Sequence, residues 1–290
     1  MKLLIIGGTG FIGKNLKNHF ENKNDIKVYA PTRQELDLFD DNLCFEYVKK
    51  LKPDIVIHSA VDITSVENTL KVFFNIYNAS EHFGHMIQIG SGAEYDKRAY
   101  EPKMKEILFK NSIPIDTYGI GKFCIANILE DSKNKKITNF RLFGIFGNYE
   151  DYSRRFISNN ICNSLVGLPV SLNRNMLFDF IWVDDFCNFL DSIFDKIPLS
   201  SISYNFCSGN PVSLLELAQI INKLMKNSDE IVIKNPGMNP EYSGDPSMLF
   251  NEIGKFSFTP FESSISKLIE FYKETMTPGD LEIFRGKVIG

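Results

Sequence analysis

The sequence predicts an α/β protein with a doubly wound parallel sheet and a smaller C-terminal lobe. Three observations support this prediction. Short apolar segments alternate with amphipathic segments of helical period through the first half of the chain, as parallel strands and their crossover helices do. A glycine-rich turn directly follows the first apolar segment. Beyond about residue 149 the alternation gives way to helical segments separated by short extended pieces.

The elements of the first half are predicted from period and length. Short apolar runs indicate buried strands, and longer runs with one apolar face indicate helices. The predicted strands are residues 2–6, 26–31, 54–60, 85–92 and 137–147. The predicted helices are residues 14–23, 42–52, 65–83 and 116–130.

The second half is predicted to be less regular. Predicted helices cover residues 153–167, 184–197, 213–225 and 263–275, and extended segments cover 169–172, 177–183 and 203–209. Ser213 and Glu216 form a capping-box pattern at the start of one helix. We expect residues 177–183 and 203–209 to return to the main sheet. The first domain would then hold residues 1–148 and about 178–207, and the lobe would hold residues 149–177 and 208–290.

Composition and charge narrow the class of function. The chain has 290 residues, of which 43% are hydrophobic and 23% are charged, and its formal net charge is -4. The acidic surplus argues against a nucleic-acid partner, because phosphate neutralisation needs clustered Lys and Arg. No segment approaches the roughly 20 apolar residues of a membrane span, and the N-terminal apolar run is too short for a signal peptide. We therefore expect a cytoplasmic protein.

The five cysteines are scattered and lie in apolar segments. Neither they nor the four histidines show the spacing of a metal site. An odd number of cysteines in apolar segments is typical of reduced thiols in a protein core. We expect a reducing compartment and no metal site.

Gly7, Gly10 and Gly13 lie at the turn between the first predicted strand and the first predicted helix. Glycines let the backbone approach a pyrophosphate, and a helix N-terminus offers unpaired N–H groups and a favourable dipole. A glycine triplet alone also fits a tight turn, but its place between a strand and an amphipathic helix favours dinucleotide binding in a Rossmann fold. The spacing is GxxGxxG instead of GxGxxG.

The end of the second predicted strand bears on the choice between NAD and NADP. A carboxylate about 20 residues beyond the glycine loop accepts the ribose hydroxyls of NAD, whereas an arginine accommodates the additional phosphate of NADP. Arg33 is near that position, and the first acid after it is Glu35. A guanidinium binds a phosphate in a fork, and a carboxylate would repel it. Arg33 also fits a solvated surface residue; the local pattern favours NADP over NAD.

Tyr118 and Lys122 lie one helical turn apart in the helix that follows the fourth predicted strand. An ammonium beside a phenol lowers the tyrosine pKa from its reference near 10, which makes the phenol usable in proton transfer at neutral pH. Tyr-x-x-x-Lys alone occurs by chance, but here the preceding strand ends at Ser91, at the edge where open α/β sheets bind ligands. We expect these three side chains to converge on one carbonyl. Gly119 and Gly121 fit a helix face pressed against a cofactor or a strand.

Several segments together give the chain a specific resemblance: GGTGFIG, HSA, GSGAEY, YGIGK, RLFGIFG, FDFIWVDD and SYNFCSGNPVSLLELA. Over essentially its whole length the chain resembles the extended short-chain dehydrogenase/reductases, the NAD(P)-dependent epimerase/dehydratase family that acts on nucleotide sugars. TRQELDL and GSGAEYDK are most similar to the ketoreductase branch that includes GDP-fucose synthase and uses NADPH.

The resemblance implies that Ser91, Tyr118 and Lys122 form a catalytic triad, in which Lys122 also holds the nicotinamide ribose. It implies cofactor contacts from the glycine loop, the end of the second strand, the HSA motif and the triad: Gly7, Thr9, Gly10, Phe11, Ile12, Gly13, Arg33, Ser59, Ala60, Tyr118 and Lys122. The expected substrate-binding residues are Ser91, Ala93, Arg154, Arg155 and Arg174. The arginines are candidate cations for a diphosphate, although the pair also fits a solvated helix face.

Departures from the family pattern argue against two of the reactions that the family catalyses. The nucleotide-sugar 4,6-dehydratases carry an Asp-Glu pair directly after the catalytic Ser or Thr, whereas Gly92 and Ala93 follow Ser91 here. Water elimination therefore lacks its acid and base. GDP-fucose synthase has an epimerising cysteine at the position of Ala93, so C3/C5 epimerase activity is also not expected. Gly144 and Phe178 replace an Asn and an Arg that commonly contact the nucleotide of the substrate.

We therefore expect an NADPH-dependent reductase of a nucleotide-linked 4-keto-(6-deoxy) sugar in surface-polysaccharide biosynthesis. An epimerase with tightly held NAD is the alternative, and a non-catalytic dinucleotide-binding regulator is a further one. The helices that contain residues 69–78 and 122–130 are apolar on more than one face. The family commonly dimerises through the matching helices, so a homodimer is expected.

Overall fold

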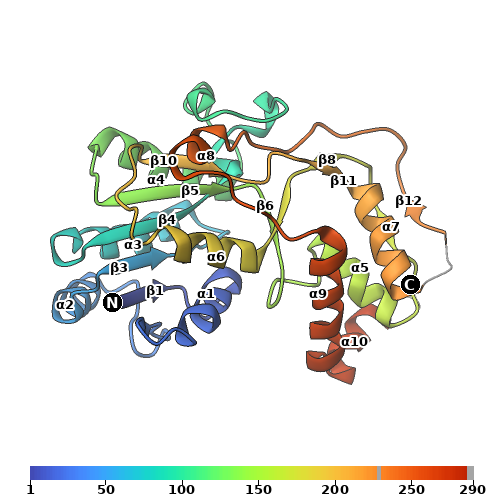
Figure 1. Ribbon diagram of the computed structural model, residues 1–290, viewed down its shortest axis with the longest axis horizontal. Coiled ribbons are helices and arrows are strands. Elements are labelled where there is room, and N and C mark those ends of the chain that lie inside the picture. Colours follow the sequence, from blue (N-terminus) through green and yellow to red (C-terminus); the bar gives the residue numbers. More distant parts are fainter. Residues whose placement is uncertain (227–229, 286–290) are drawn as a thin grey trace.

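A six-stranded parallel sheet forms the centre of the computed structural model, which describes residues 1–226 and 230–285 (Figure 1). Its strands are β1 (Lys2–Ile6), β2 (Lys27–Tyr29), β3 (Ile55–His58), β4 (His85–Ser91), β5 (Ile137–Leu142) and β10 (Ser203–Phe206). Their order is β10-β5-β4-β3-β1-β2, and every neighbouring pair is parallel. The order reverses between β1 and β3. The predicted doubly wound sheet is confirmed, and its ligand crevice is expected at the carboxyl ends of these two strands.

Apolar side chains on both faces of the sheet hold the flanking helices. In β1, Leu3 and Ile5 face a layer that contains α1 (Phe11–Glu21) and α6 (Val183–Ile193). Leu4 and Ile6 face the other layer, which contains α2 (Asp41–Leu51), α3 (Val66–Tyr77) and α4 (Thr117–Ser132). All four side chains are at most 1% exposed, and burying each one stabilises the fold by about 1.5–3 kcal/mol. Covering on both faces explains why the strands are continuous apolar runs.

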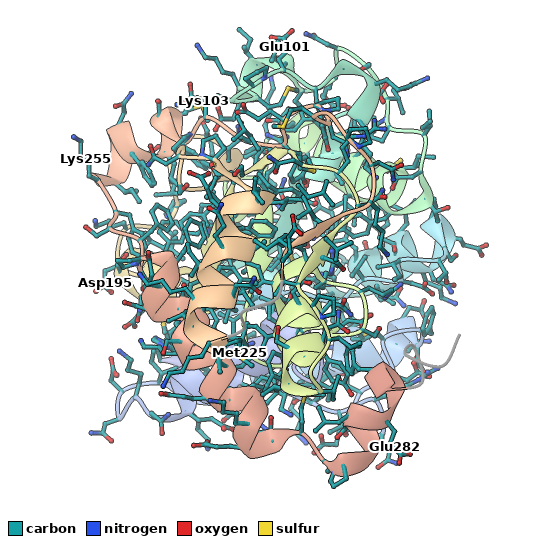
Figure 2. The ribbon with its side chains drawn as sticks, turned by 90° about the vertical axis from the view of Figure 1, so that its right-hand side faces the viewer. Glu101, Lys103, Asp195, Met225, Lys255 and Glu282 are labelled. Atoms are coloured by element: carbon teal, nitrogen blue, oxygen red, sulfur yellow. The ribbon has the colours of Figure 1, made fainter. Side chains whose placement is uncertain are left out.

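The helices of the C-terminal half pack around an apolar cluster of their own. They are α5 (Phe156–Leu165), α7 (Leu214–Met225), α9 (Phe261–Thr275) and α10 (Pro278–Arg285), on the right of Figure 1. Figure 2 views them from that side, with Met225 at the end of α7 and Glu282 in α10. The capping box predicted for Ser213 and Glu216 is confirmed at the start of α7. The boundaries between two domains remain a prediction.

Short strands join the main sheet to this cluster. They are β6 (Gly144–Phe146), β7 (Ser171–Leu172), β8 (Leu177–Phe178), β9 (Phe180–Trp182), β11 (Val212–Ser213) and β12 (Val232–Ile233). β6 pairs with β9, β8 with β11, and β7 with β12. The prediction that residues 177–183 return to the main sheet is therefore wrong, whereas β10 returns beside β5 as expected. Phe146 and Trp182 are buried in the cluster of C-terminal helices. The prediction failed because an apolar run in a sequence does not show which of two cores will bury it.

Two helices lie where the sequence predicts irregular structure. α8 (Ser247–Ile253) has seven residues, and α10 follows directly on α9. Neither is long enough to show a clear helical period. α8 begins directly after Pro246 and buries Leu249 against the core that covers one face of the sheet.

A long connection between β4 and α4 reaches the C-terminal segment of residues 240–245. It contains three single turns, η2 (Gly92–Glu94), η3 (Lys97–Ala99) and η4 (Glu106–Leu108). The N–H of Met104 donates to Ser243 O at 3.0 Å, and the N–H of Asp245 donates to Met104 O at 2.9 Å. Figure 2 shows Glu101 and Lys103 of this connection at the end of the molecule opposite Glu282. The C-terminal segment is thereby held close to the end of β4.

Within residues 1–226 and 230–285, no helix combines the length and apolar character needed to cross a membrane. Over the same residues, no group of three or more His, Cys, Asp or Glu side chains is arranged to hold a metal ion. Four of the five cysteines are buried and Cys124 is half-buried, which agrees with thiols in a protein core.

Candidate active site

Two glycines shape the loop after β1. Gly7 has a φ of +87°, and a Cβ on it would lie 2.8 Å from Ala60 N at the end of β3. A Cβ on Gly13 would lie 2.1 Å from Gly7 O. Gly10 is the N-cap of α1 and makes no side-chain cap, so the first N–H groups of the helix have no side-chain partner there. A narrow glycine loop in front of an uncapped helix end fits the pyrophosphate of a dinucleotide.

We predict that Gly13→Ala weakens dinucleotide binding at least about tenfold. The added methyl group cannot be accommodated unless the loop moves, because it would overlap the carbonyl oxygen of Gly7. Calorimetric titration with NADPH measures the dissociation constant. Gly279→Ala is the matched control, because its methyl group would meet only Thr277 Oγ1, at 3.7 Å. Equal affinity in Gly13→Ala and the wild type would contradict the assignment of the loop.

Beside the loop, a cavity of about 380 Å³ lies between the ends of β1, β2 and β3. Its lining includes four of the predicted cofactor residues, namely Gly7, Thr9, Arg33 and Ala60. The neighbouring Ser59 donates its hydroxyl to Ile6 O at 2.8 Å. Phe11 and Ile12 form the first turn of α1. A concave site of this size at the switch point of the sheet suits one end of a dinucleotide.

Arg33 is an exposed cation at this cavity, and its guanidinium carbon lies 5.9 Å from the centre of the Phe39 ring. Glu35 turns away, because Oε2 accepts bonds from the N–H and the hydroxyl of Thr32 at 2.7 and 2.9 Å. These bonds lower the pKa of the Glu35 carboxyl. Asp62 also lines the cavity, but its carboxylate accepts bonds from Thr64 and Asn68.

Ser91, Tyr118 and Lys122 come together at the carboxyl end of β4. Ser91 ends the strand, and its Oγ accepts the N–H of Ala93 at 3.1 Å. Tyr118 lies in the first turn of α4, and the Ser91 side chain is close enough to act on the pKa of its phenol. Lys122 is 3% exposed and donates from Nζ to Ile89 O at 2.6 Å. Two adjacent elements thus present a hydroxyl, a phenol and an ammonium at one place.

The predicted lowering of the Tyr118 pKa is not what the structure shows. Burial is the largest influence and raises the pKa of the phenol, while the neighbouring Ser91 side chain and the charge of Arg155 oppose that rise. Burial lowers the pKa of Lys122 to about 8, and the charge of Glu94 opposes that change. The prediction considered only the charge of Lys122 beside Tyr118. It left out desolvation of the phenol, which raises the pKa. At neutral pH Tyr118 is therefore a proton donor beside a charged Lys122.

The pKa of about 8 for Lys122 predicts an alkaline limit on catalysis. The ammonium predominates below that pH and the neutral amine above it, whereas Tyr118 keeps its proton. We expect kcat/KM to fall as the pH rises through about 8 in the wild type. In Lys122→Arg the remaining activity should keep its level to higher pH, because a guanidinium stays charged. Superimposable pH profiles of the two proteins would refute this role.

Gly119 and Gly121 allow α4 to pack closely on its neighbours. A Cβ on Gly119 would lie 2.8 Å from Ala93 O, directly after the strand end that carries Ser91. A Cβ on Gly121 would lie 3.1 Å from Thr69 Cγ2 in α3. The contact predicted with a strand thus lies in the turn that follows β4, and the second glycine packs on a helix. Close packing brings Tyr118 to Ser91, which explains two glycines in a helix despite a cost of about 0.5–1 kcal/mol each.

A buried ion pair supports Ser91, and sequence reasoning missed it. Glu94 accepts the N–H of Ser91 at 2.9 Å and the Nε–H of Arg141 at 2.6 Å. Arg141 is fully buried in β5, and its second bond goes to Glu130 at 2.8 Å. Burial raises the pKa of Glu94, and the charge of Arg141 opposes that rise. An arginine inside a predicted buried strand was the available signal, because a buried guanidinium requires a partner.

Two further phenols, Tyr100 and Tyr242, lie beside the triad and were not predicted. Tyr100 donates its hydroxyl to Gly92 O at 3.0 Å. The Tyr242 ring packs on that of Tyr100 with a centroid distance of 5.1 Å, and its hydroxyl would lie 2.6 Å from a Cβ on Gly92. Both residues belong to stretches without regular period, so no sequence pattern places them in the site.

The three arginines predicted to bind the substrate have different surroundings in the structure. Arg155 is the N-cap of α5, and its charge acts on Tyr118. Arg154 instead bonds Asp151 at 2.7 Å on the exposed surface. Arg174 is exposed between β7 and β8. Ala93 is buried, with its carbonyl against α4.

The two positions that depart from the family pattern are in contact with each other. A Cβ on Gly144 would lie 2.5 Å from Cε1 of Phe178. The Phe178 ring also packs on Phe180 and Tyr242, with centroid distances of 4.2 and 4.8 Å. Apolar and aromatic groups thus fill a place where a polar contact to the substrate was expected.

Comparisons with known proteins identify the family and the fold of the chain. Residues 3–205 match the family described as the NAD dependent epimerase/dehydratase family. A GDP-6-deoxy-D-talose 4-dehydrogenase of Aggregatibacter actinomycetemcomitans is 25% identical over a gapped alignment 297 residues long, which covers 95% of this chain and 98% of that protein. Among solved structures, a GDP-L-fucose synthetase of Naegleria fowleri superimposes with a TM-score of 0.81 and 17% identity, over 94% of this chain and 93% of the other. A GDP-mannoheptose C4 reductase of Campylobacter jejuni with NADP bound gives 0.78 and 19%, over 94% and 98%.

The match spans well over half of the chain, and the protein belongs to the NAD dependent epimerase/dehydratase family. The solved structures share its fold.

Proposed function

We propose that the protein is an NADPH-dependent reductase of a nucleotide-linked 4-keto-(6-deoxy) sugar, used in surface-polysaccharide biosynthesis. The convergence of Ser91, a protonated Tyr118 and Lys122 at the end of β4 carries this proposal. The triad also argues against a purely regulatory dinucleotide-binding protein. The relative named for a GDP-sugar 4-dehydrogenase supports a reaction at C4 and a GDP-linked substrate.

Each residue of the triad has a distinct role in this reaction. A nicotinamide dinucleotide, when bound, supplies the hydride for the carbonyl carbon. Tyr118 donates its proton to the carbonyl oxygen, and Ser91 orients that oxygen. Lys122 stabilises the phenolate that forms, because an ammonium lowers the energy of a nearby anion. The bond from Lys122 to Ile89 O fixes the ammonium beneath α4.

No free carboxylate follows Ser91 in the turn after β4, and this favours reduction over water elimination. Gly92 and Ala93 carry no acid, and the next carboxylate, Glu94, is 1% exposed. Its oxygens are bonded to the Ser91 N–H and to Arg141. A carboxylate held in this way cannot approach a sugar carbon, so it cannot serve as the acid or base of a dehydratase.

Arg33 is the residue we expect to select NADPH. It lies at the cavity between the ends of β1, β2 and β3, where the nearby Glu35 is bonded to Thr32. We predict that Arg33→Ala raises the KM for NADPH about tenfold and leaves the KM for NADH within about twofold, because only the phosphate loses its charged partner. Initial rates with both cofactors measure this preference. Lys49→Ala, which removes an exposed ammonium already paired with Glu46, is the control. Equal losses with both cofactors would contradict selection by Arg33.

Arg155 is the favoured cation for the diphosphate of the substrate. It starts α5, and its charge reaches Tyr118. We keep Arg174 and Ala93 as proposed substrate contacts. Arg154 is the least favoured of the proposed substrate contacts, because its guanidinium is already bonded to Asp151.

We also propose that the protein is a cytoplasmic homodimer formed through α3 and α4. Sedimentation analysis of the purified protein tests the dimer.

The amount of NADPH oxidised for each sugar converted tests the proposed function. The purified protein is incubated with NADPH and with GDP- or dTDP-linked 4-keto-6-deoxyhexoses, and the absorbance at the reduced-nicotinamide band is followed. A reductase oxidises one NADPH per sugar reduced. An epimerase, the alternative that uses the same triad, retains NAD through purification and converts the sugar without net loss of NADPH. The second result would replace the proposed function by the alternative.

A further inference from the structure

The carboxylate of Glu94, in the turn after β4, is held from two sides. Glu94 is 1% exposed, and its oxygens accept the N–H of Ser91 at 2.9 Å and the Nε–H of Arg141 at 2.6 Å. Asn139 of β5 donates from Nδ2 to both oxygens, at 3.3 and 3.1 Å. An ionised carboxylate accepts from each of these donors, so together they fix it in one orientation.

Gly90 brings this carboxylate close to Lys122. A Cβ on Gly90 would lie 2.4 Å from Oε1 of Glu94, so the carboxylate rests against β4 where a side chain would otherwise project. The Nζ of Lys122 donates to the carbonyl of Ile89, the residue before Gly90, at 2.6 Å. A buried carboxylate and an ammonium that is 3% exposed therefore lie against adjacent residues of one strand.

The charge of Glu94 is available to Lys122 because a second carboxylate shares Arg141. Glu130, near the end of α4, accepts from Nη2 of Arg141 at 2.8 Å. Two cations thus face two anions, and the four charges balance. Buried charges interact strongly, because little water screens them. Burial favours the neutral amine of a lysine, whereas an adjacent carboxylate favours the ammonium.

Among the described residues, the other titratable groups near these four charges supply no counter-charge to the ammonium. His58 in β3 is neutral, because burial lowers its pKa to about 4. The phenols of Tyr95 and Tyr118 keep their protons, because burial raises their pKa values. Glu106 in η4 is a further carboxylate, and the charge that it feels is that of Arg141.

We propose that Glu94 is a positioning residue of the reaction, which fixes the peptide of Ser91 and supplies the counter-charge of the Lys122 ammonium. The proposal rests on the proposed function, in which Ser91 orients the carbonyl oxygen and Lys122 stabilises the phenolate. Glu94 lies beneath the turn and does not touch the substrate. One carboxylate thereby keeps two members of the triad in their working state, the first in position and the second charged.

Two substitutions at Glu94 separate its charge from its length. Glu94→Gln removes the charge and keeps the shape, so the alkaline limit of kcat/KM should move down from about pH 8 by at least about one unit. Glu94→Asp keeps the charge and shortens the side chain. Its alkaline limit should stay near pH 8, and kcat/KM below that pH should fall about tenfold, because Ser91 loses the bond that fixes it.

Asp185→Asn is the matched control, because it neutralises a buried carboxylate away from the triad. Asp185 is 4% exposed and accepts the N–H and the hydroxyl of Thr259 at 2.9 and 2.7 Å. A purely structural role for Glu94 would leave its variants like this one, with a lower melting temperature and an alkaline limit near pH 8. An unmoved limit in Glu94→Gln, or an unchanged kcat/KM in Glu94→Asp, overturns the proposal.

The titration of Lys122 itself tests the proposal without a substrate. NMR of protein with isotope-labelled lysine follows the ε-carbons, and the Lys122 resonance is the one missing from Lys122→Arg. Its midpoint should lie near pH 8 in the wild type and at least about one unit lower in Glu94→Gln.

The wild-type midpoint remains decisive if Glu94→Gln does not fold. A value of about 5–6, as found for buried lysines without a counter-charge, overturns the proposal. If the wild type reduces no keto sugar, the proposed function fails, and the expected midpoints still uphold Glu94 as the counter-charge of Lys122.

Discussion

Tyr118→Phe is expected to lower kcat for keto-sugar reduction by about 10²- to 10⁴-fold, the usual contribution of a positioned general acid. The variant keeps the ring but loses the proton that the carbonyl oxygen must receive. Burial raises the pKa of this phenol, so the wild type holds the proton through neutral pH. Glu94 and Asp116 are the carboxylates whose charges act on Tyr118. Glu94 is bonded to Arg141 and Asp116 caps α4, and neither replaces the phenol as a donor.

The melting temperature separates loss of chemistry from loss of structure in this variant. It should remain close to that of the wild type, because the hydroxyl lies in the site and the packing of α4 depends on Gly119 and Gly121. Steady-state rates at saturating NADPH give the kcat. A variant that retains more than about a tenth of the wild-type kcat would exclude Tyr118 as the acid.

Arg141→Met is expected to reduce the free energy of unfolding by about 3–5 kcal/mol, because it leaves the Glu94 carboxylate buried without its charged partner. Arg141 is fully buried, with bonds to Glu94 at 2.6 Å and to Glu130 at 2.8 Å. The change corresponds to a fall in melting temperature of about 5–15 °C for a chain of this size. Urea titration measures the loss directly.

Lys110→Met is the matched control, because it breaks an ion pair of similar length on the surface. Lys110 bonds Asp131 at 2.8 Å, and the two side chains are 36% and 66% exposed. Exposed pairs contribute about 0–1 kcal/mol, so this variant should be nearly as stable as the wild type. Equal losses in the two variants would show that the buried pair has no special role.

The loss in Arg141→Met should also become smaller as the pH falls. Burial raises the pKa of Glu94 in the folded protein above its unfolded value, and removal of Arg141 raises it further. The folded state then binds more protons than the unfolded state at mildly acidic pH, which stabilises the folded state as the pH is lowered. The same titration at pH 5 and pH 8 shows whether the loss follows the charge of Glu94.

Local sequence patterns predicted the elements that depend on neighbouring residues. β1, the glycine loop and α1 follow one another within a few residues, and the capping box of α7 joins Ser213 to Glu216. Ser91, Tyr118 and Lys122 were found because their spacing reflects the same strand–helix order. Each of these features is determined by contacts within one element or between adjacent ones.

Features that depend on distant residues were not predictable in this way. The partner of β6 is β9, and the ring of Tyr242 packs on that of Tyr100 from a distant part of the chain. No local sequence pattern shows whether an apolar strand is buried in the main sheet or against α5, α7 and α9. The direction of the Tyr118 pKa shift was wrong for the same reason, because desolvation arises from all the elements packed around the phenol.

Isotope transfer tests the central claim most directly. NADPH that carries deuterium at the transferred position of its nicotinamide is supplied with the 4-keto sugar, and the product is analysed by mass spectrometry and NMR. We predict one deuterium at C4 of the product for each NADPH oxidised by the wild type, and at least about 10²-fold less labelled product in the same time with Tyr118→Phe. A product without deuterium, formed while the NADPH remains intact, would contradict the account.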